Sequence, residues 1–373
     1  MIAGLLALLT TALPAVALSG VPAAAAVRAG PASLGVTSVA FSPDGTLVAA
    51  GYGDGTVRLW VTATSTERGP AGRAGSGPVT AMAFSPDGAM LASADADGTI
   101  SWWSPATFAA QGSPLRAAGR VTDVAFSPDG TLLASAGADG GVTLWNVATG
   151  QVSGPVLRPA VTAGGGVTGV AFSPDGAMLA AAYGDGTIVR WDPVTAGPAG
   201  PALQAGSGVR GVAFSPDGKF LASADADGGV TVWTVATGQR HGPVLRSGSG
   251  SGVTGVAFSP DGAVLAAAYG DGTIRLWNPA AGGAVGSALQ AGSGVNAVAF
   301  GPGGKLAGAQ ANGAVKVWNT AGFLPGRSVR DWFILAAAVL ALQRSAVEQG
   351  QRHGGSYGCI GGSTTEKAAQ SKR

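Results

Sequence analysis

Residues 167–191 read VTGVAFSPDGAMLAAAYGDGTIVRW, and close copies of this stretch recur through most of the chain. In each copy a phenylalanine is followed by a tryptophan, 19 residues later in six copies and 18 residues later in the seventh. Successive phenylalanines are 42 to 46 residues apart. So constant an interior predicts a repeat architecture in which every copy is one small unit of structure. The seven pairs are Phe41 and Trp60, Phe84 and Trp103, Phe126 and Trp145, Phe172 and Trp191, Phe214 and Trp233, Phe258 and Trp277, and Phe300 and Trp318.

Each copy reads as short β-strands separated by turns. In the first copy, strands are expected at residues 36–41, 47–50 and 56–60. The turns between them are Ser42-Pro43-Asp44-Gly45 and Gly53-Asp54-Gly55, where proline presets φ and glycine accepts a positive φ. Asp-Gly between short apolar runs is a strong hairpin signal, and it occurs twice in each of the first six copies.

A fourth, weaker strand is expected between one tryptophan and the next copy, as at residues 155–158. A four-stranded sheet of this size cannot bury both of its faces by itself, whereas radial stacking buries each sheet between its neighbours. The sequence therefore predicts an all-β fold, a seven-bladed β-propeller of four-stranded antiparallel blades over residues 31–321. The seven phenylalanine and tryptophan pairs are then the core between blades.

The pattern VAFSPDG–LAS–DG–VxLW, at a period near 42, resembles the WD-repeat β-propeller family. The resemblance implies a rigid, non-catalytic scaffold that binds protein or peptide partners. Two features depart from the family. Its Gly-His dipeptide before the first strand is absent throughout, and only Trp191-Asp192 keeps the Trp-Asp pair.

In the family, the missing histidine joins a hydrogen-bond network with a loop aspartate, a hydroxyl of the second strand and the tryptophan. Without it, we expect the loop aspartates to act as turn-formers that bond nearby backbone N–H groups. These residues are Asp54, Asp97, Asp139, Asp185, Asp227 and Asp271.

One ring of positions, two residues before the loop aspartate, differs in kind from copy to copy. Three of the four tyrosines of the chain lie in it, and tyrosine offers a large contact area at low entropic cost. We therefore expect this ring to bind a partner, with coverage of the neighbouring blade as the alternative. The residues are Tyr52, Asp95, Tyr183, Asp225, Tyr269 and Gln310.

Catalytic and metal-binding residues are scarce. Fourteen of the 20 acidic residues fall in the repeated turns, and the others form no paired carboxylates. The two histidines, His241 and His353, lie far apart, and the single cysteine, Cys359, excludes an internal disulfide. The sequence predicts no catalytic residue, no metal and no cofactor.

Charged residues make up only 11% of the chain, and the formal net charge is +2. The basic residues are scattered and form no stripe with aromatic side chains. Binding to nucleic acid is therefore not expected.

The N-terminal segment, residues 1–30, allows three interpretations. Residues 1–27 carry no charged side chain, and Ala24-Ala25-Ala26 fits a signal-peptide cleavage site. The apolar run over residues 2–18 is also at the lower length limit for a membrane anchor. Alternatively, residues 23–30 form the strand that closes the last blade, a role that otherwise falls to residues 323–329.

The C-terminal part, residues 322–373, differs from the repeats in composition. Residues 332–342 read WFILAAAVLAL, which predicts a short apolar helix, and the polar remainder is expected to be disordered.

The sequence thus favours a non-catalytic WD-repeat scaffold that binds protein or peptide partners through its rim loops. An extracytoplasmic propeller enzyme, a hydrolase or a lyase, and the sensor part of a membrane-anchored signalling protein stay open as alternatives. An extracytoplasmic location, secreted or anchored through the N-terminal segment, is expected, with the cytoplasm as the alternative.

Overall fold

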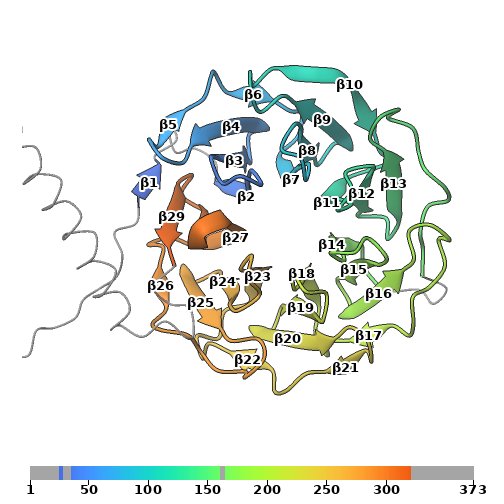
Figure 1. Ribbon diagram of the computed structural model, residues 1–373, viewed down its shortest axis with the longest axis vertical. Helices are drawn as coiled ribbons and strands as arrows, with labels where there is room; N and C mark the ends of the chain where they lie inside the picture. The colour runs from blue at the N-terminus through green and yellow to red at the C-terminus, as the bar shows by residue number, and fades with distance from the viewer. Residues whose placement is uncertain (1–24, 28–34, 160–163, 321–373) are drawn as a thin grey trace, which may run out of the picture. The chain divides into compact units, whose positions relative to one another are not determined.

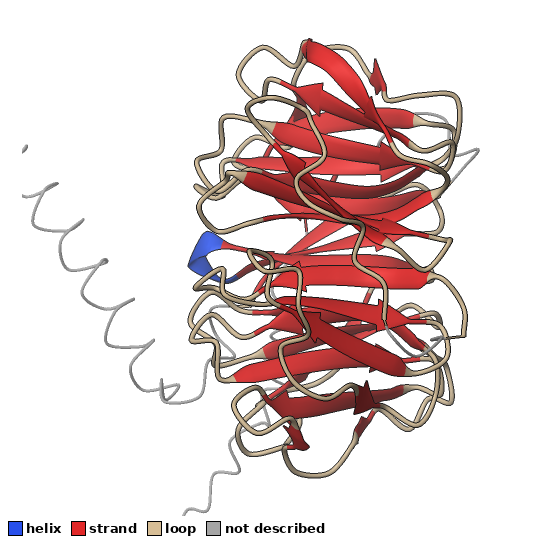
Figure 2. Cartoon of the chain, turned by 90° about the vertical axis from the view of Figure 1, so that its right-hand side faces the viewer, coloured by secondary structure: helices blue, strands red, loops and turns tan. Residues whose placement is uncertain are grey.

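Seven small antiparallel sheets surround a common axis and form the blades of one propeller (Figure 1). The computed structural model describes residues 25–27, 35–159 and 164–320. The expected all-β fold of seven blades is confirmed: within these ranges the helical structure is limited to one short 3-10 turn, η1 at Pro302–Gly304 (Figure 2). The helix expected at residues 332–342, the tail after it and the segment 323–329 lie outside the described residues.

The first three strands of every blade follow the repeat. The innermost strands are β2 (Val36–Phe41), β7 (Val79–Phe84), β11 (Val121–Phe126), β14 (Val167–Phe172), β18 (Val209–Phe214), β23 (Val253–Phe258) and β27 (Val295–Gly301). The second strands are β3 (Leu47–Tyr52), β8 (Leu91–Asp95), β12 (Leu132–Gly137), β15 (Leu179–Tyr183), β19 (Phe220–Asp225), β24 (Leu265–Tyr269) and β28 (Lys305–Gln310). The third strands are β4 (Thr56–Val61), β9 (Thr99–Trp103), β13 (Val142–Asn146), β16 (Thr187–Trp191), β20 (Gly229–Thr234), β25 (Thr273–Trp277) and β29 (Val315–Asn319).

The outer strands are short and irregular. In blades 1, 3, 4 and 5 Gly-Pro pairs interrupt them, and proline has no N–H to donate to a ladder. Blade 3 keeps only isolated bridges, Val142 with Leu157 and Trp145 with Val152, in place of a regular outer strand. The other outer strands are β5 (Thr66–Glu67) and β6 (Gly72–Arg73) in blade 1, β10 (Ala110–Arg116), β17 (Leu203–Gln204), β21 (Gln239–Arg240) and β22 (Leu245–Arg246) in blade 5, and β26 (Leu289–Gln290).

The core is divided into seven hydrophobic clusters, and each unites residues of two neighbouring blades. All seven repeat tryptophans are at most 6% exposed. Of the repeat phenylalanines, Phe41, Phe214 and Phe258 are buried, and the other four are partly buried. The tryptophans thus lie between blades, where each excludes a large apolar area from water.

Blade 7 is completed by the N-terminal strand β1 (Ala25–Val27). This strand pairs antiparallel with β29, so that Ala25 lies opposite Val317 and Val27 opposite Val315. One hydrophobic cluster joins Trp60 and Val36 of blade 1 to Val315 of blade 7. The ring is therefore closed by a strand from the N-terminal segment, which is one of the three alternatives stated above. No helix in the described part of the chain is long and apolar enough to cross a membrane.

The SPDG turn after each inner strand is held by its own side chains. In blade 1 the Ser42 hydroxyl donates to Asp44 Oδ1 over 2.6 Å and accepts the Leu47 amide hydrogen over 2.9 Å. Gly45 has φ +67°, a conformation that glycine adopts without strain. The same contacts recur in the next five blades.

Candidate functional site

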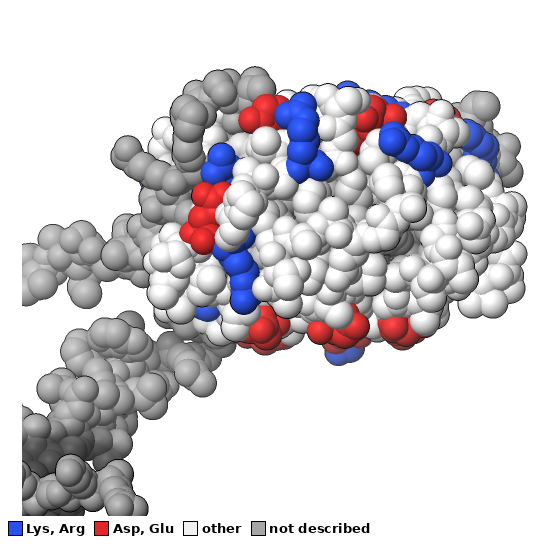
Figure 3. Space-filling view, turned by 90° about the horizontal axis from the view of Figure 1, so that it is seen from above, with Lys and Arg blue, Asp and Glu red and all other residues white. Residues whose placement is uncertain are grey.

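The two edges of the propeller differ in composition. Because neighbouring strands are antiparallel, the SPDG turns and the loops between second and third strands lie at opposite edges. We call these the SPDG face and the loop-Asp face, the latter after Asp54, Asp97, Asp139, Asp185, Asp227 and Asp271. In the side view of Figure 3, acidic side chains lie along two opposite edges, and the wall between them is largely uncharged.

Each loop aspartate closes its own turn. Its Oδ1 atom accepts the amide hydrogen two residues later, over 2.9 to 3.1 Å, in all six blades that carry an aspartate. Asn312 does the same for the Ala314 amide in blade 7. This is the turn geometry that the sequence predicts for these residues.

The ring expected to contact a partner is buried. Tyr183, Tyr269 and Asp95 are 0% exposed, Asp225 is 2%, Gln310 is 3% and Tyr52 is 6% exposed. The expectation that these side chains present an open contact surface is therefore wrong. They end the second strands, pair with the first residue of the inner strand, and so lie inside the sheet rather than in the loop.

The tyrosines instead cover the neighbouring blade. Tyr183 packs with Val142 and Leu144 of blade 3, and its hydroxyl donates to the Gly140 carbonyl over 3.4 Å. Burial raises the pKa of Tyr52, Tyr183 and Tyr269 above that of a free tyrosine. This agrees with the alternative interpretation of the ring.

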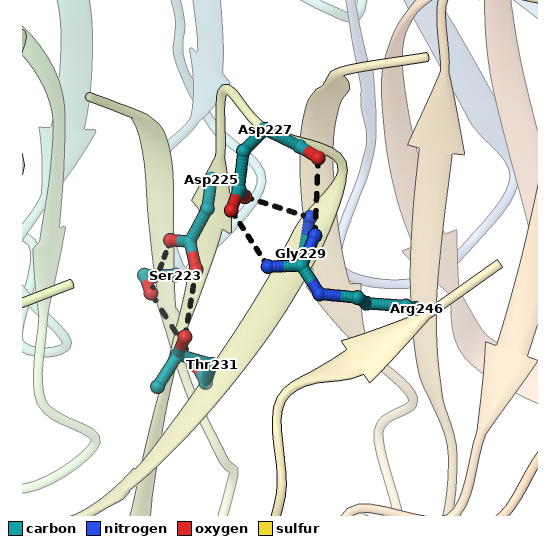
Figure 4. A network of polar contacts seen from close by, with 6 residues as sticks. All are labelled: Ser223, Asp225, Asp227, Gly229, Thr231 and Arg246. Atoms are coloured by element: carbon teal, nitrogen blue, oxygen red, sulfur yellow. Dashed lines mark hydrogen bonds and ion pairs between the residues drawn. The ribbon is translucent and has the colours of Figure 1, made fainter. Parts of the chain in front are cut away.

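Blade 5 contains a continuous polar network beneath the loop-Asp face (Figure 4). Trp233 Nε1 donates to the Ser223 hydroxyl over 3.3 Å, and Ser223 donates to Asp225 Oδ1 over 2.8 Å. The Thr231 hydroxyl donates to Asp225 Oδ2 over 2.6 Å. Burial raises the pKa of Asp225 to about 6, against the effect of these two hydroxyl bonds. The carboxylate therefore ends a hydrogen-bond chain that starts at the tryptophan.

The loop aspartate of the same blade lies outside this network. Asp227 Oδ2 accepts a hydrogen bond from Arg246 over 2.6 Å, and the same guanidinium donates to the Asp227 carbonyl (Figure 4). Asp139 and Arg158 form the corresponding pair in blade 3. Both pairs are about half exposed, so they contribute little to stability.

Blade 2 has the same second strand and loop as blade 5, LASADADG at residues 91–98 and 221–228, but lacks the partners of its buried carboxylate. Trp103 Nε1 donates to Ser93 over 2.9 Å, yet neither oxygen of Asp95 has a hydrogen-bond partner. Ser101, which stands where blade 5 has Thr231, donates instead to the Ala74 carbonyl. Burial, with a further contribution from the Asp97 charge, raises the pKa of Asp95 to about 7.

Asp97 is ionised beside this buried acid. The Ser76 hydroxyl and amide both donate to Asp97 Oδ2, and they hold the pKa of Asp97 below its usual range. The loop backbone covers the pair closely. A Cβ atom on Gly75 would lie 2.1 Å from Asp95 Oδ2 and 3.1 Å from Asp97 Oδ2. Two carboxyl groups of opposite protonation preference thus lie beneath one glycine loop.

The family model for the WD domain, G-beta repeat, matches residues 27–61, 71–104, 112–146, 159–192, 202–234 and 242–278, more than half of the chain. The chain belongs to the WD-repeat family. The six matched repeats correspond to blades 1–6, and the structure supplies the seventh blade, whose turns depart from the consensus as Gly303-Gly304 and Asn312-Gly313. A comparison with curated proteins gave no match.

In this WD-repeat chain the tryptophan keeps its serine partner in blades 2, 3 and 5. No histidine of the described residues takes part, and in blade 5 the carboxylate of Asp225 completes the network instead. Within the described ranges, no three His, Cys, Asp or Glu side chains are grouped so that they could hold a metal ion.

Sequence reasoning missed a second ring of polar side chains, at the second residue of the inner strands. Five of them donate to the first carbonyl of the next blade over 2.6 to 2.7 Å. The repetition of threonine at this position in five of the seven repeats was the available signal. The donors are Thr37, Thr122, Thr168, Thr254 and Asn296, and Asn296 links blade 7 to blade 1.

Proposed function

We propose that this chain is a non-catalytic scaffold that binds protein or peptide partners through the loop-Asp face. Membership of the WD-repeat family supports a binding role, because propellers of this family are typically scaffolds for protein interactions. Fold alone does not decide function, so the surface has to carry the argument.

The single observation that favours the loop-Asp face is its variation between blades. The SPDG turns are the same in six blades. On the SPDG face, these turns therefore give a partner few features by which to tell one blade from another. On the loop-Asp face, by contrast, only blades 3 and 5 carry an arginine–aspartate pair, and blade 7 has asparagine in place of aspartate. An irregular pattern of charge gives a partner a defined register.

The exposed residues before the loop aspartates test this proposal. Ala138 and Ala226 are exposed there, whereas Ala89 and Ala177 are exposed on the SPDG face and serve as matched controls. Partners captured by the wild-type chain should be lost with the double variant Ala138→Arg, Ala226→Arg. They should be retained with Ala89→Arg, Ala177→Arg. Loss in the control variant alone would show that the SPDG face binds the partner, and would refute the proposal.

A further inference from the structure

Charge is almost absent from the seven inner strands. Asp123 in blade 3 and Arg210 in blade 5 are the two charged residues of β2, β7, β11, β14, β18, β23 and β27. Inner strands pair with a second strand on one side only, so their other edge faces the propeller axis with backbone N–H groups available for bonding. The two charged residues therefore lie beside a ring of backbone donors.

Asp123 shows how a carboxylate fits this edge. Its Oδ1 atom accepts the Val124 amide hydrogen and its Oδ2 atom accepts the Val170 amide hydrogen of the next blade, each over 2.9 Å. A carboxylate that bridges two blades through backbone donors is a charge-assisted arrangement. The third residue of the inner strand, where Asp123 stands, is Ser, Ala or Gly in the other six blades.

Blade 5 offers the same arrangement without its own carboxylate. Gly211 is the equivalent of Asp123, and the register of β18 against β19 shifts at the same point as that of β11 against β12. The equivalent amides are those of Val212 and Val256. A Cβ atom on Gly211 would meet nothing within 4 Å, whereas one on Gly169 would lie 2.9 Å from the Gly211 Cα. The position at Gly211 is thus open, and the one in blade 4 is closed.

The surroundings of Gly211 are also accessible and positively charged. Val124 and Val170, beside Asp123, are 5% exposed, but Val212 and Val256 are partly exposed. Arg210 is exposed, and none of the four ion pairs formed by the described residues includes it. Its guanidinium extends to blade 6, 3.6 Å from a Cβ position on Gly252. An exposed cation outside these ion pairs therefore stands at the residue directly before Gly211.

We propose that the axial surface of blades 5 and 6 binds a carboxylate of a peptide ligand. The carboxylate accepts the amide hydrogens of Val212 and Val256, as Asp123 does between blades 3 and 4, and Arg210 supplies the counter-charge. This goes beyond the proposed function because it uses no residue of the loop-Asp face. The carboxylate can come from a peptide C-terminus or from an acidic side chain, and the test distinguishes the two.

The test uses the ¹⁵N-labelled full chain and three synthetic peptides: acetyl-Ala-Ala with a free carboxylate, acetyl-Ala-Ala-amide, and acetyl-Ala-Glu-Ala-amide. We expect the Val212 and Val256 amide resonances to shift with the first or the third peptide, which identifies the source of the carboxylate. The uncharged amide should cause no shift. Equal shifts with all three peptides, or none with either carboxylate, would overturn the proposal.

Two variants locate the site. Arg210→Thr installs the residue of most other blades and should weaken binding about tenfold or more, since charge-assisted bonds are the strong ones. Gly211→Asp supplies an internal carboxylate, which blade 3 already accommodates, and should abolish binding. Arg240→Thr removes an exposed arginine from the outer strand and should leave the affinity within about twofold, because distant surface charges are screened. Equal effects of Arg210→Thr and Arg240→Thr would mean that overall charge, not this site, holds the peptide.

Discussion

Asp95 and Asp225 occupy the same position in two repeats that share the stretch LASADADG, yet only Asp225 has hydrogen-bond partners. One difference between the two repeats lies at the residue six positions later, which is serine in blade 2 and threonine in blade 5. Thr231 bonds Asp225, whereas Ser101 bonds the Ala74 carbonyl over 2.5 Å. The hydroxyl at this position thus bonds the aspartate in blade 5 and a backbone carbonyl in blade 2. In blade 2 the buried carboxylate of Asp95 therefore has no hydrogen-bond partner.

Removing the charge of Asp95 should stabilise the protein at high pH. Because the folded pKa is raised to about 7 from 3.8, the folded state holds the proton more tightly, and stability falls as pH rises from about 4 to about 7. Asp95→Asn should therefore be more stable than wild type by about 1–3 kcal/mol at pH 8, the cost of an unpartnered buried group. The gain should vanish at pH 4, as measured by urea unfolding.

Asp225→Asn is the matched control for that prediction. Its carboxylate accepts two hydroxyl bonds, and an amide offers only one oxygen to replace them. Because the pKa of Asp225 is raised to about 6, less than that of Asp95, and two bonds are at stake, we expect a smaller gain at pH 8 from this variant. A similar gain in both variants would show that the hydroxyl partners of Asp225 are without effect.

Asp95 and Asp225 belong to the buried ring of residues that end the second strands. In each blade, the residue two positions before the ring residue varies together with it. Serine precedes aspartate in blades 2 and 5, whereas alanine precedes tyrosine in blades 1, 4 and 6. Only Ser223 joins the tryptophan N–H to a carboxylate, whereas Ser93 and Ser135 accept the tryptophan N–H without a bond to a carboxylate. Where alanine stands, the bulk of the tyrosine fills the space between blades.

Ser223→Ala should therefore be costly. It leaves Trp233 Nε1 without its acceptor and removes one donor from Asp225, so we expect a loss of about 1–3 kcal/mol in the free energy of unfolding. Ser135→Ala in blade 3, where Gly137 follows, should cost less because no bond to a carboxylate is lost with the Trp145 bond. Equal losses in calorimetry would contradict the coupling between serine and aspartate.

At the scale of elements, the SPDG turn is a self-contained unit. In each turn the serine and aspartate side chains bond the backbone of the turn, and the glycine adopts the positive φ that the turn requires. The glycine of one turn also lies close to the proline of the turn in the neighbouring blade. A Cβ atom on Gly130 would lie 3.6 Å from Pro86 Cδ, and one on Gly88 would lie 3.5 Å from Pro43 Cδ. The turns thus provide both local conformation and contact between blades.

Asp129→Ala tests the turn. The carboxylate accepts bonds from the Ser127 hydroxyl and the Thr131 amide, which also hold its pKa below the usual value. We expect the variant to lose about 1–2 kcal/mol at pH 7, the range for bonds to a charged acceptor. The loss should shrink in acid as wild-type Asp129 takes up its proton. Val194→Ala, at a residue 90% exposed, should change the stability by less than about 0.5 kcal/mol.

At the scale of the whole molecule, stability depends on closing the ring between blades 7 and 1. Three kinds of contact do so: the β1–β29 pairing, the hydrophobic cluster around Trp60, and the bond from Asn296 to the Val36 carbonyl. Lys305 adds a bond to the Gly45 carbonyl. Residues some 260 positions apart are thereby neighbours.

Deletion of residues 1–27 should weaken this closure. It removes β1 and leaves β29 as an unpaired edge, which is a template for association with other chains. We expect a lower unfolding midpoint and concentration-dependent association in size-exclusion chromatography. Deletion of residues 1–22 retains β1 and is the control. Identical behaviour of the two shortened chains would show that β1 is dispensable.

The repeat in the sequence was sufficient to predict seven blades, the first three strands of each and the core tryptophans, because these depend on local turn chemistry and on a period of about 42 residues. The outer strand expected at residues 155–158 is reduced to isolated bridges in blade 3. It was also sufficient to predict the turn aspartates, whose partners lie two residues away. The burial of Tyr52, Tyr183 and Tyr269 could not be predicted this way, because it depends on the blade packed against each of them.

What the sequence by itself determined is therefore the unit: its strands, its turns and the number of copies, since each rests on interactions within a few residues. What only the tertiary structure decided is how the copies differ. Asp95 is isolated and Asp225 is satisfied, Asp123 bridges two blades and Gly211 leaves the same position open, although all four residues belong to copies of one repeat. The physical reason is that these states depend on groups of the adjoining blade or of the opposite strand, and only the closed ring brings those groups together.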